Sequence, residues 1–150
     1  MPKNEKNAEA KIFLKQAQKL DRMINNKIAE KEQWLAMAKG MGSFSAGERV
    51  QSSGSQQKMA DNIEKYVDID REIDEIIDKL IETKKDILNV IEQLNVNEYD
   101  LLHKVYIQGF ELYEVSTMMD KSYSWCTTVH GKALEDVQRI LDDRKALGPS

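Results

Sequence analysis

The chain has 150 residues and a formal net charge of −4, from 22 Lys and Arg against 26 Asp and Glu. This length suits one domain, or one compact module with one extended element, and the acidic balance excludes a strongly basic protein that wraps nucleic acid. Hydrophobic residues make up 41% of the chain, which argues against wholesale disorder, and 32% charged residues with 2 Pro and 7 Gly favour long, exposed helices.

Residues 1–39 are predicted to form one long helix. Their apolar residues recur at steps of three and four, which places them on one helical face: Phe13, Ala17, Leu20, Ile24, Ile28, Leu35 and Ala38. No Gly or Pro interrupts the run between Lys3 and Gly40. Gly40 and Gly42 then supply a C-terminal stop, because glycine readily adopts the left-handed conformation that ends helices.

Residues 40–57 are rich in Gly, Ser and Gln and are predicted to form a loop. Four of the glycines of the chain fall here: Gly40, Gly42, Gly47 and Gly54. Connections of this length are uncommon in compact domains and are usually functional or flexible. We favour a flexible connector over a phosphate-binding loop for the polar stretch 51–56.

Residues 58–94 carry the strongest helical signal of the chain. Eleven positions follow an unbroken alternation of steps of four and three, and nine of them are apolar, which is typical of a coiled-coil seam: Met59, Ile63, Tyr66, Asp70, Ile73, Ile77, Leu80, Lys84, Ile87, Ile91 and Leu94. The two polar members, Asp70 and Lys84, either set the register of the seam or lie where a partner helix leaves room.

The two long helices are expected to carry opposite charge. Residues 1–39 hold nine Lys and Arg against five Asp and Glu, whereas residues 58–97 hold six against eleven. Opposite charge favours pairing of the two helices, and an antiparallel helical hairpin closed by the loop follows. An intermolecular coiled coil is the rival arrangement, because the spacing alone is compatible with both.

Residues 98–150 change in character, because most aromatic residues of the chain concentrate there: Tyr99, Tyr106, Phe110, Tyr113, Tyr123 and Trp125. The apolar spacing predicts a short helix over 98–108, which Gly109 stops. A second short helix is predicted over 112–119. This region therefore has the composition of a compact helical module.

A tight turn at Asp120 and Lys121 is predicted to separate the helix over 112–119 from a third helix. Ser122 is a good N-cap for that third helix, which runs to about Ala146. Asp tolerates the left-handed backbone that such a turn often needs. The pattern is therefore two helices joined by a tight turn, in which the second helix is longer and a further helix precedes the pair. This pattern indicates a helix-turn-helix.

Residues 105–134 contain three further sequence elements. Tyr106 and Gly109 lead into the first motif helix, Glu114-Val115-Ser116 lies within it, and the next helix starts at Ser122 and contains His130-Gly131-Lys132-Ala133-Leu134. On these elements the stretch resembles region 4 of sigma-70-type factors, and it is most similar to small phage transcriptional regulators of the ArpU/RinA type. The likeness extends over the long N-terminal helices and the Gly- and Ser-rich loop at 50–59, so it spans most of the chain.

The resemblance implies an all-α protein with two parts. Residues 1–97 would form the long, coiled-coil-like antiparallel hairpin with its loop at 40–57, and residues 98–150 a sigma region 4-like helix-turn-helix domain of three helices. The implied function is a phage-type transcriptional regulator that binds promoter DNA, RNA polymerase or both. Helix-turn-helix proteins commonly dimerise, so a homodimer is a further expectation.

Eight residues are candidates for contact with double-stranded DNA if the third helix enters the major groove: Lys121, Ser122, Tyr123, Ser124, Trp125, Thr127, Thr128 and Lys132. Threonine methyl groups can contact thymine methyl groups, and hydroxyl groups can bond phosphates or base edges. Lys121 and Lys132 are expected to anchor phosphates.

An alternative function stays open from the same residues. The third helix begins Ser-Tyr-Ser-Trp-Cys-Thr-Thr, without Arg, and residues 98–150 hold six Lys and Arg against nine Asp and Glu. Neutralisation of phosphates drives affinity for DNA. The alternative is therefore a protein–protein interaction module, a helical-hairpin adaptor or inhibitor whose helix-turn-helix has lost DNA binding.

The sequence points away from enzymatic chemistry. No nucleophile–base pair, Gly-rich phosphate loop or HExxH motif appears, so we predict no catalytic residue and no cofactor. Cys126 and His130 have the spacing of metal ligands on a helix, but Cys126 falls on the apolar stripe, and we predict no metal site.

The composition also predicts a cellular compartment. Cys126 is the single cysteine, so the chain cannot form an internal disulfide and suits a reducing environment. The N-terminal stretch has no apolar signal region, and no run approaches the roughly 18 to 20 apolar residues of a membrane span. We expect a cytoplasmic protein without membrane contact, in the host cell if the chain is phage-encoded.

Overall fold

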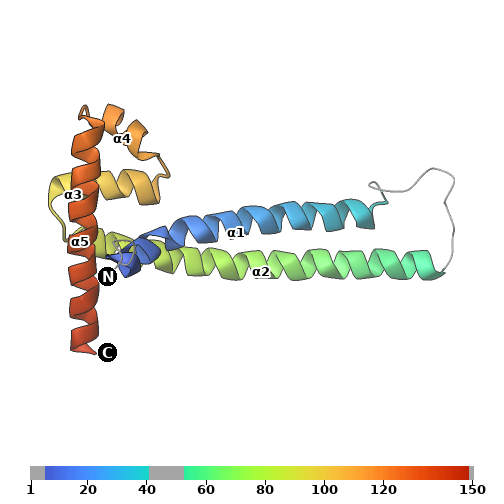
Figure 1. Ribbon diagram of the computed structural model, residues 1–150. Helices are drawn as coiled ribbons and strands as arrows, with labels where there is room; N and C mark the ends of the chain where they lie inside the picture. The colour runs from blue at the N-terminus through green and yellow to red at the C-terminus, as the bar shows by residue number, and fades with distance from the viewer. Residues whose placement is uncertain (1–5, 41–52, 149–150) are drawn as a thin grey trace. The chain divides into compact units, whose positions relative to one another are not determined.

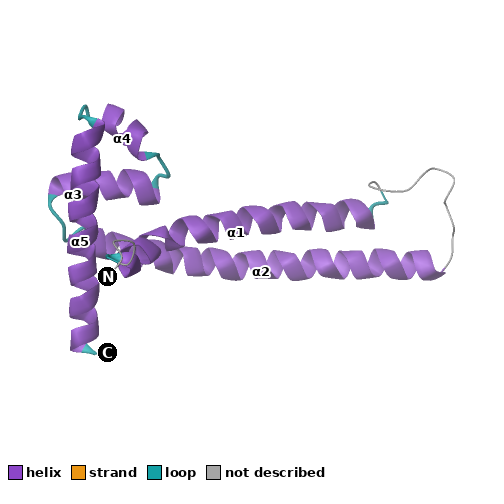
Figure 2. Ribbon diagram, viewed as in Figure 1, coloured by secondary structure: helices purple, strands orange, loops and turns teal. Residues whose placement is uncertain are grey.

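The computed structural model describes residues 6–40 and 53–148, and this part of the chain is all-helical (Figures 1 and 2). The elements are α1 (Ala8–Ala38), α2 (Ser53–Ile91), α3 (Val96–Leu102), the π-helical turn η3 (His103–Ile107), α4 (Leu112–Met118) and α5 (Tyr123–Leu147). None of these helices combines the length and the apolar character that crossing a bilayer requires. The all-α class is therefore confirmed.

Packing divides the chain into two compact units. The two-helix unit comprises residues 20–40 and 53–80, and the multihelix unit comprises residues 6–19 and 81–148. Each of the long helices α1 and α2 contributes one stretch to each unit. The boundaries between the units do not coincide with the change in composition at residue 98. They follow contacts between stretches that are distant in the sequence.

In the two-helix unit, α1 and α2 run antiparallel (Figure 1). Lys27 Nζ lies 2.6 Å from Glu72 Oε2, and Lys31 Nζ lies 2.6 Å from Asp70 Oδ1. The residue number on α2 falls as that on α1 rises, so the two helices point in opposite directions. Hydrogen bonds to the two carboxylates raise the pKa of both lysines.

The seam predicted along residues 58–94 holds only in part. Ile73 and Leu80 are buried, together with Ile69, which the predicted seam omits. Three apolar seam positions are exposed instead: Met59, Ile63 and Ile77. One partner helix covers only a narrow arc of α2, so it cannot bury the whole apolar pattern. Leu94 falls beyond the end of α2.

The predicted loop at 40–57 is wrong in its last part, because α2 begins at Ser53. Gln57 Nε2 donates a hydrogen bond to Asp61 Oδ1 at 3.0 Å, between residues one helical turn apart. Helix elongation is favourable once a helix has formed, so the long α2 extends into the Ser- and Gln-rich stretch. The remainder of the predicted loop, residues 41–52, lies outside the described residues.

The core of the multihelix unit joins stretches from all five α-helices. Its fully buried large side chains are Leu14, Ile87, Val90, Ile91, Leu101, Leu102, Val115, Cys126 and Val137. The amide of Gln18 donates to the carbonyl oxygen of Val105 at 2.8 Å. Ala10 N donates to Gln138 Oε1 at 3.1 Å. The first part of α1 is therefore tied to α5 and η3 by both burial and hydrogen bonds.

The helix predicted over 98–108 divides into α3 and η3. In η3 the backbone bonds reach one residue further than in an α-helix, since Gln108 N donates to the carbonyl oxygen of His103 at 2.9 Å. Gly109 follows with a φ of 85° and ends the segment, as the sequence predicts. α4 and α5 keep their predicted bounds to within one residue.

Candidate nucleic-acid interface

The turn between α4 and α5 has the hydrogen bond that closes a Schellman motif. Asp120 adopts a φ of 56°, and Lys121 N donates to the carbonyl oxygen of Ser116 at 2.9 Å. Ser122 then caps α5, because its hydroxyl oxygen accepts a hydrogen bond from Trp125 N at 3.0 Å. The predictions of a left-handed backbone at Asp120 and of a Ser122 cap are both confirmed.

Substitutions at Asp120 are expected to rank by their tolerance of a positive φ. Asp120→Gly should be at least as stable as the wild type, because glycine adopts this backbone without steric cost. Asp120→Ala should lose about 1 kcal/mol, because its Cβ crowds the following carbonyl and no polar group compensates. Urea unfolding of the two variants measures the order, and equal stability of the Ala and Gly variants would contradict it.

The residues predicted to contact DNA lie around the N-terminal end of α5. Trp125 is half-buried, and the other seven are exposed: Lys121, Ser122, Tyr123, Ser124, Thr127, Thr128 and Lys132. α5 turns by about 100° per residue, so Ser124 and Thr128 share a side that points away from the buried Cys126. We call these eight residues the α5 surface.

The two lysines of the α5 surface have different neighbours. Lys121 Nζ lies 5.2 Å from the centre of the Trp125 ring, a cation–π contact. Lys132 Nζ donates to Asp136 Oδ1 at 3.1 Å. A carboxylate therefore offsets part of the Lys132 charge, and Lys121 is the better placed of the two to attract a phosphate.

A hydrogen bond that the sequence did not predict joins η3 to α5. Tyr106 Oη lies 2.7 Å from His130 Nε2, and the two rings stack with centroids 5.8 Å apart. Burial raises the pKa of Tyr106 to about 12. Burial also lowers the pKa of His130, and the positive charges of Lys11 and Lys15 act in the same direction. A neutral His130 can accept the hydrogen bond that the Tyr106 hydroxyl donates.

Cys126 and His130, the pair with metal-ligand spacing, have other roles in this packing. Cys126 is fully buried in the core, and burial raises the pKa of its thiol. His130 is engaged with Tyr106. Within residues 6–40 and 53–148, no group of three or more His, Cys, Asp or Glu side chains is arranged to hold a metal ion.

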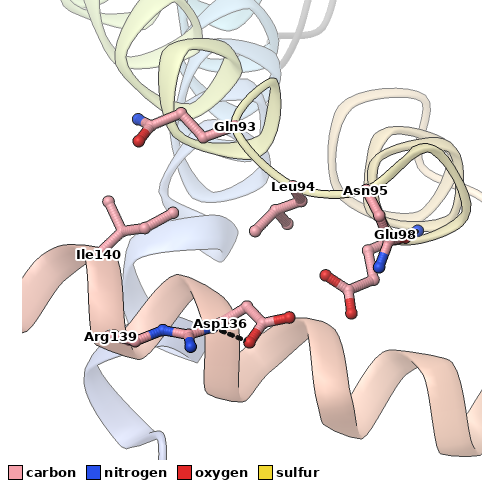
Figure 3. Close-up of a pocket in the computed structure, with 7 residues that line it drawn as sticks. All are labelled: Gln93, Leu94, Asn95, Glu98, Asp136, Arg139 and Ile140. Carbon is pink, nitrogen blue, oxygen red and sulfur yellow. Dashed lines mark hydrogen bonds and ion pairs between the residues drawn. The ribbon is translucent and has the colours of Figure 1, made fainter.

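Glu98 and Asp136 direct their carboxyl groups toward one another at a small cavity of the multihelix unit (Figure 3). The cavity has a volume of about 230 Å³ and is lined by Gln93, Leu94, Asn95, Glu98, Asp136, Arg139 and Ile140. Glu98 is 3% exposed, and its Oε1 has no hydrogen-bond partner among the described residues. Asp136 Oδ1 accepts hydrogen bonds from Lys132 and Arg139.

The two carboxyl groups at this cavity differ in their affinity for a proton. Burial, reinforced by the neighbouring Asp136, raises the pKa of Glu98 to about 7. Burial also opposes ionisation of Asp136, but hydrogen bonds from Glu98 and Lys132 outweigh it and lower the pKa of Asp136. Glu98 is therefore the group of the two that retains a proton up to near-neutral pH, whereas Asp136 is ionised beside Lys132 and Arg139.

The prediction of contact residues omits two exposed side chains of α4. Tyr113 is 64% exposed and Met118 is also exposed, as is Tyr123 at the start of α5. The sequence does contain a signal for these two residues. They are large apolar side chains that fall outside the buried stripe of a short helix. They add apolar area to the same helix pair that carries the α5 surface.

The α5 surface can offer hydrogen bonds from hydroxyl groups, positive charge from Lys121 and flat apolar contact from Tyr123. Such groups bind phosphates, base edges or another protein. Comparisons of the chain with models of protein families, with curated proteins and with solved structures find no match. The function is therefore argued from the surface and from the sequence.

Proposed function

We propose that the chain is a phage-type transcriptional regulator that binds promoter DNA through a sigma region 4-like helix-turn-helix. In this proposal residues 1–97 form a long helical hairpin, residues 98–150 form the DNA-binding domain, and the protein acts in the host cytoplasm. One observation carries it: a left-handed turn at Asp120 joins α4 to α5, while the first turns of α5 keep an exposed face. The resemblance of residues 105–134 to region 4 of sigma-70-type factors supports the transcriptional role and adds RNA polymerase as a partner.

The first turns of α5 have the chemistry for the major groove. The N-terminus of a helix carries a partial positive charge, and Lys121 adds a full charge beside it. Ser124 and Thr128 are exposed on the outward side and can bond base edges or phosphates. Gly131 is also exposed, and apart from the adjacent backbone of α5 and the two neighbouring residues no heavy atom lies within 4 Å of the position that a Cβ would take. The α5 backbone can therefore approach the duplex closely at this point.

The second candidate function, docking to a protein, has its own supporting observation. Tyr113, Met118 and Tyr123 are exposed on the helix pair, and aromatic and Met side chains are enriched at protein interfaces. Residues 98–150 carry more acidic than basic side chains. This candidate retains the helix-turn-helix as a scaffold and replaces DNA by RNA polymerase or another protein.

Affinity for a fluorescently labelled, mixed-sequence DNA duplex is expected to fall steeply as salt concentration rises, because released counterions drive binding to phosphates. Lys121→Ala should reduce the slope of log affinity against log salt by about 1, which corresponds to one lost phosphate contact. Fluorescence anisotropy across a salt series measures both slopes. Lys79→Ala, at an exposed lysine of α2, is the matched control and should keep the wild-type slope.

Two results would count against direct DNA binding. One is the absence of any binding at low salt by a chain whose circular dichroism shows folded helices. The other is an equal reduction of the slope in the Lys121 and Lys79 variants. That result would mean that binding depends on the total charge of the chain and not on a phosphate contact made by Lys121. The first result favours the docking function, and Tyr113→Ala then becomes the informative variant, measured by capture of purified RNA polymerase.

A further inference from the structure

The two-helix unit buries its apolar residues incompletely. None of the largest fully buried side chains of the described chain belongs to it, and its best-buried large side chain, Ile69, still has a few per cent exposed. Seven large hydrophobic residues of the unit are exposed: Met23, Ile28, Met37, Met59, Ile63, Val67 and Ile77. Two packed helices share only one seam, so an apolar arc wider than that seam needs a further layer of helices to cover it.

The exposed apolar residues of α2 gather on one side of the helix. At about 100° per residue, Met59, Ile63 and Ile77 fall within an arc of about 40°, and Asp70 lies in the same arc. The opposite side of α2 is charged, with Lys65, Glu72 and Lys79. α2 therefore has one apolar and one charged flank beside its seam with α1.

Contacts between the helices show which side of α1 lies next to the apolar flank. Lys31 pairs with Asp70 on that flank, and its Nζ lies 5.0 Å from the centre of the Tyr66 ring. Lys27 pairs with Glu72 on the charged flank. By helical phase, Ile28 lies on the Lys31 side of α1. One apolar face of the unit therefore comprises Ile28, Met59, Ile63, Tyr66 and Ile77, with Asp70 and Lys31 between them.

We propose that this apolar face binds the same face of a second copy of the chain and forms a two-fold symmetric four-helix bundle. Ile63 and Ile77 lie seven residues on either side of Asp70. A two-fold axis beside Asp70 therefore sets Ile63 of one copy against Ile77 of the other in an antiparallel α2–α2 contact. A face that is symmetric about its own centre in this way fits an isologous interface.

Charge at the centre of the face fits the same symmetry. Each copy brings a Lys31–Asp70 pair to the axis, so an ammonium group of the same copy offsets the charge of each carboxylate where the two Asp70 residues face one another. A partner with a different sequence would have no reason to match this spacing. Paired charge at the centre with apolar side chains at both ends also fixes the register of the contact.

The face is large enough for a specific dimer. Met59 to Ile77 span about 27 Å along α2, and two packed helices are about 20 Å wide. Each copy would therefore bury about 550 Å², and the pair about 1,100 Å². A biological interface is expected to exceed about 1,000 Å² in total.

Sedimentation equilibrium of the full chain tests the proposal, with a mass of two chains expected for the wild type. The double variant Ile63→Glu, Ile77→Glu should sediment as one chain, because it places charges opposite one another on the apolar face. Met37→Glu is the matched control, at an exposed residue on the other side of α1, and should keep the two-chain mass. Circular dichroism checks that each variant keeps its helices.

A wild-type chain that sediments as a single chain throughout the concentration series would overturn the proposal and leave the face to a partner of another sequence. Loss of the two-chain mass in Met37→Glu as well would also overturn it. All three substitutions lie in residues 20–80, outside the α5 surface, so failure here is distinguishable from failure of DNA binding.

Disulfide cross-linking tests the position of the axis. Asp70→Cys should link two copies under mild oxidation, because residue 70 faces itself across the axis. Glu75→Cys, on the side of α2 away from the face, should stay unlinked. The native Cys126 is fully buried and does not interfere. A two-chain mass without linkage in the Asp70→Cys variant contradicts the proposed face.

Discussion

Replacing Glu98 with Gln is expected to stabilise the chain well above pH 7 and to change little in acid. In the folded chain the pKa of Glu98 is about 7, against an ordinary value of 4.5. The native state therefore holds a proton that the unfolded state releases between these two pH values. The stability of the wild type then falls as pH rises through this window, because the unfolded state binds fewer protons than the native state.

The glutamine of the Glu98→Gln variant would keep the shape of the side chain and donate a hydrogen bond to Asp136 without ionising. One pKa unit corresponds to about 1.4 kcal/mol, so we expect the variant to exceed the wild type by about 3 kcal/mol in alkaline solution. The pKa of Asp136 is lowered from 3.8, so its titration belongs to more acidic solution. Urea unfolding at a series of pH values measures the difference.

Glu92→Gln, at an exposed glutamate just beyond α2, is the matched control for Glu98→Gln. It changes the net charge by the same amount and should follow the wild-type pH profile. A Glu98→Gln variant that stays parallel to the wild type across pH 7 would show that Glu98 does not carry the proton.

The second large expected effect concerns Leu14 on α1. Leu14 is fully buried in the multihelix unit, whereas Ile12, two residues earlier, is 66% exposed. Leu14→Ala should reduce the free energy of unfolding by about 2 to 5 kcal/mol, because it removes buried methyl groups and leaves a cavity. Ile12→Ala should stay within about 0.5 kcal/mol of the wild type.

Urea unfolding followed by far-ultraviolet circular dichroism measures both variants. Equal small losses would mean that the first part of α1 does not belong to the core of α3, α4 and α5. The larger loss of stability expected for Leu14→Ala than for Ile12→Ala has a practical consequence. A fragment of residues 98–150 would lack Leu14, Ile87 and Ile91 and should not reach the stability of the full chain.

Signals that act over a few residues predicted the local structure well. The sequence predicts Gly109 as the end of a helix and Asp120 as a left-handed turn residue, and both have a positive φ, which few residue types adopt readily. Ser122 was recognised because an N-cap needs a short hydroxyl or carboxyl side chain. These signals located the candidate surface on α5, since its boundaries depend on the turn and the cap.

Features that depend on packing between distant residues were beyond the sequence. The apolar pattern of α2 could not show which of its residues meet α1, so Ile77 was grouped with Ile73 although only Ile73 is buried. Glu98 and Asp136 form a pair only because α3 and α5 pack together. The hydrogen bond between Tyr106 and His130 has the same origin. No spacing rule connects residues so far apart in the chain.

The wide turn of η3 constrains the length of this segment as well as its composition. A π-helical turn holds one residue more than an α-helical turn. Deleting one residue from His103–Ile107 would rotate the rest of the segment by about 100° relative to α3. The ring of Tyr106 would then point away from His130 on α5. The chain would also continue from Gly109 in a different direction. A single-residue deletion here should therefore misalign both motif helices, even if every buried side chain were retained.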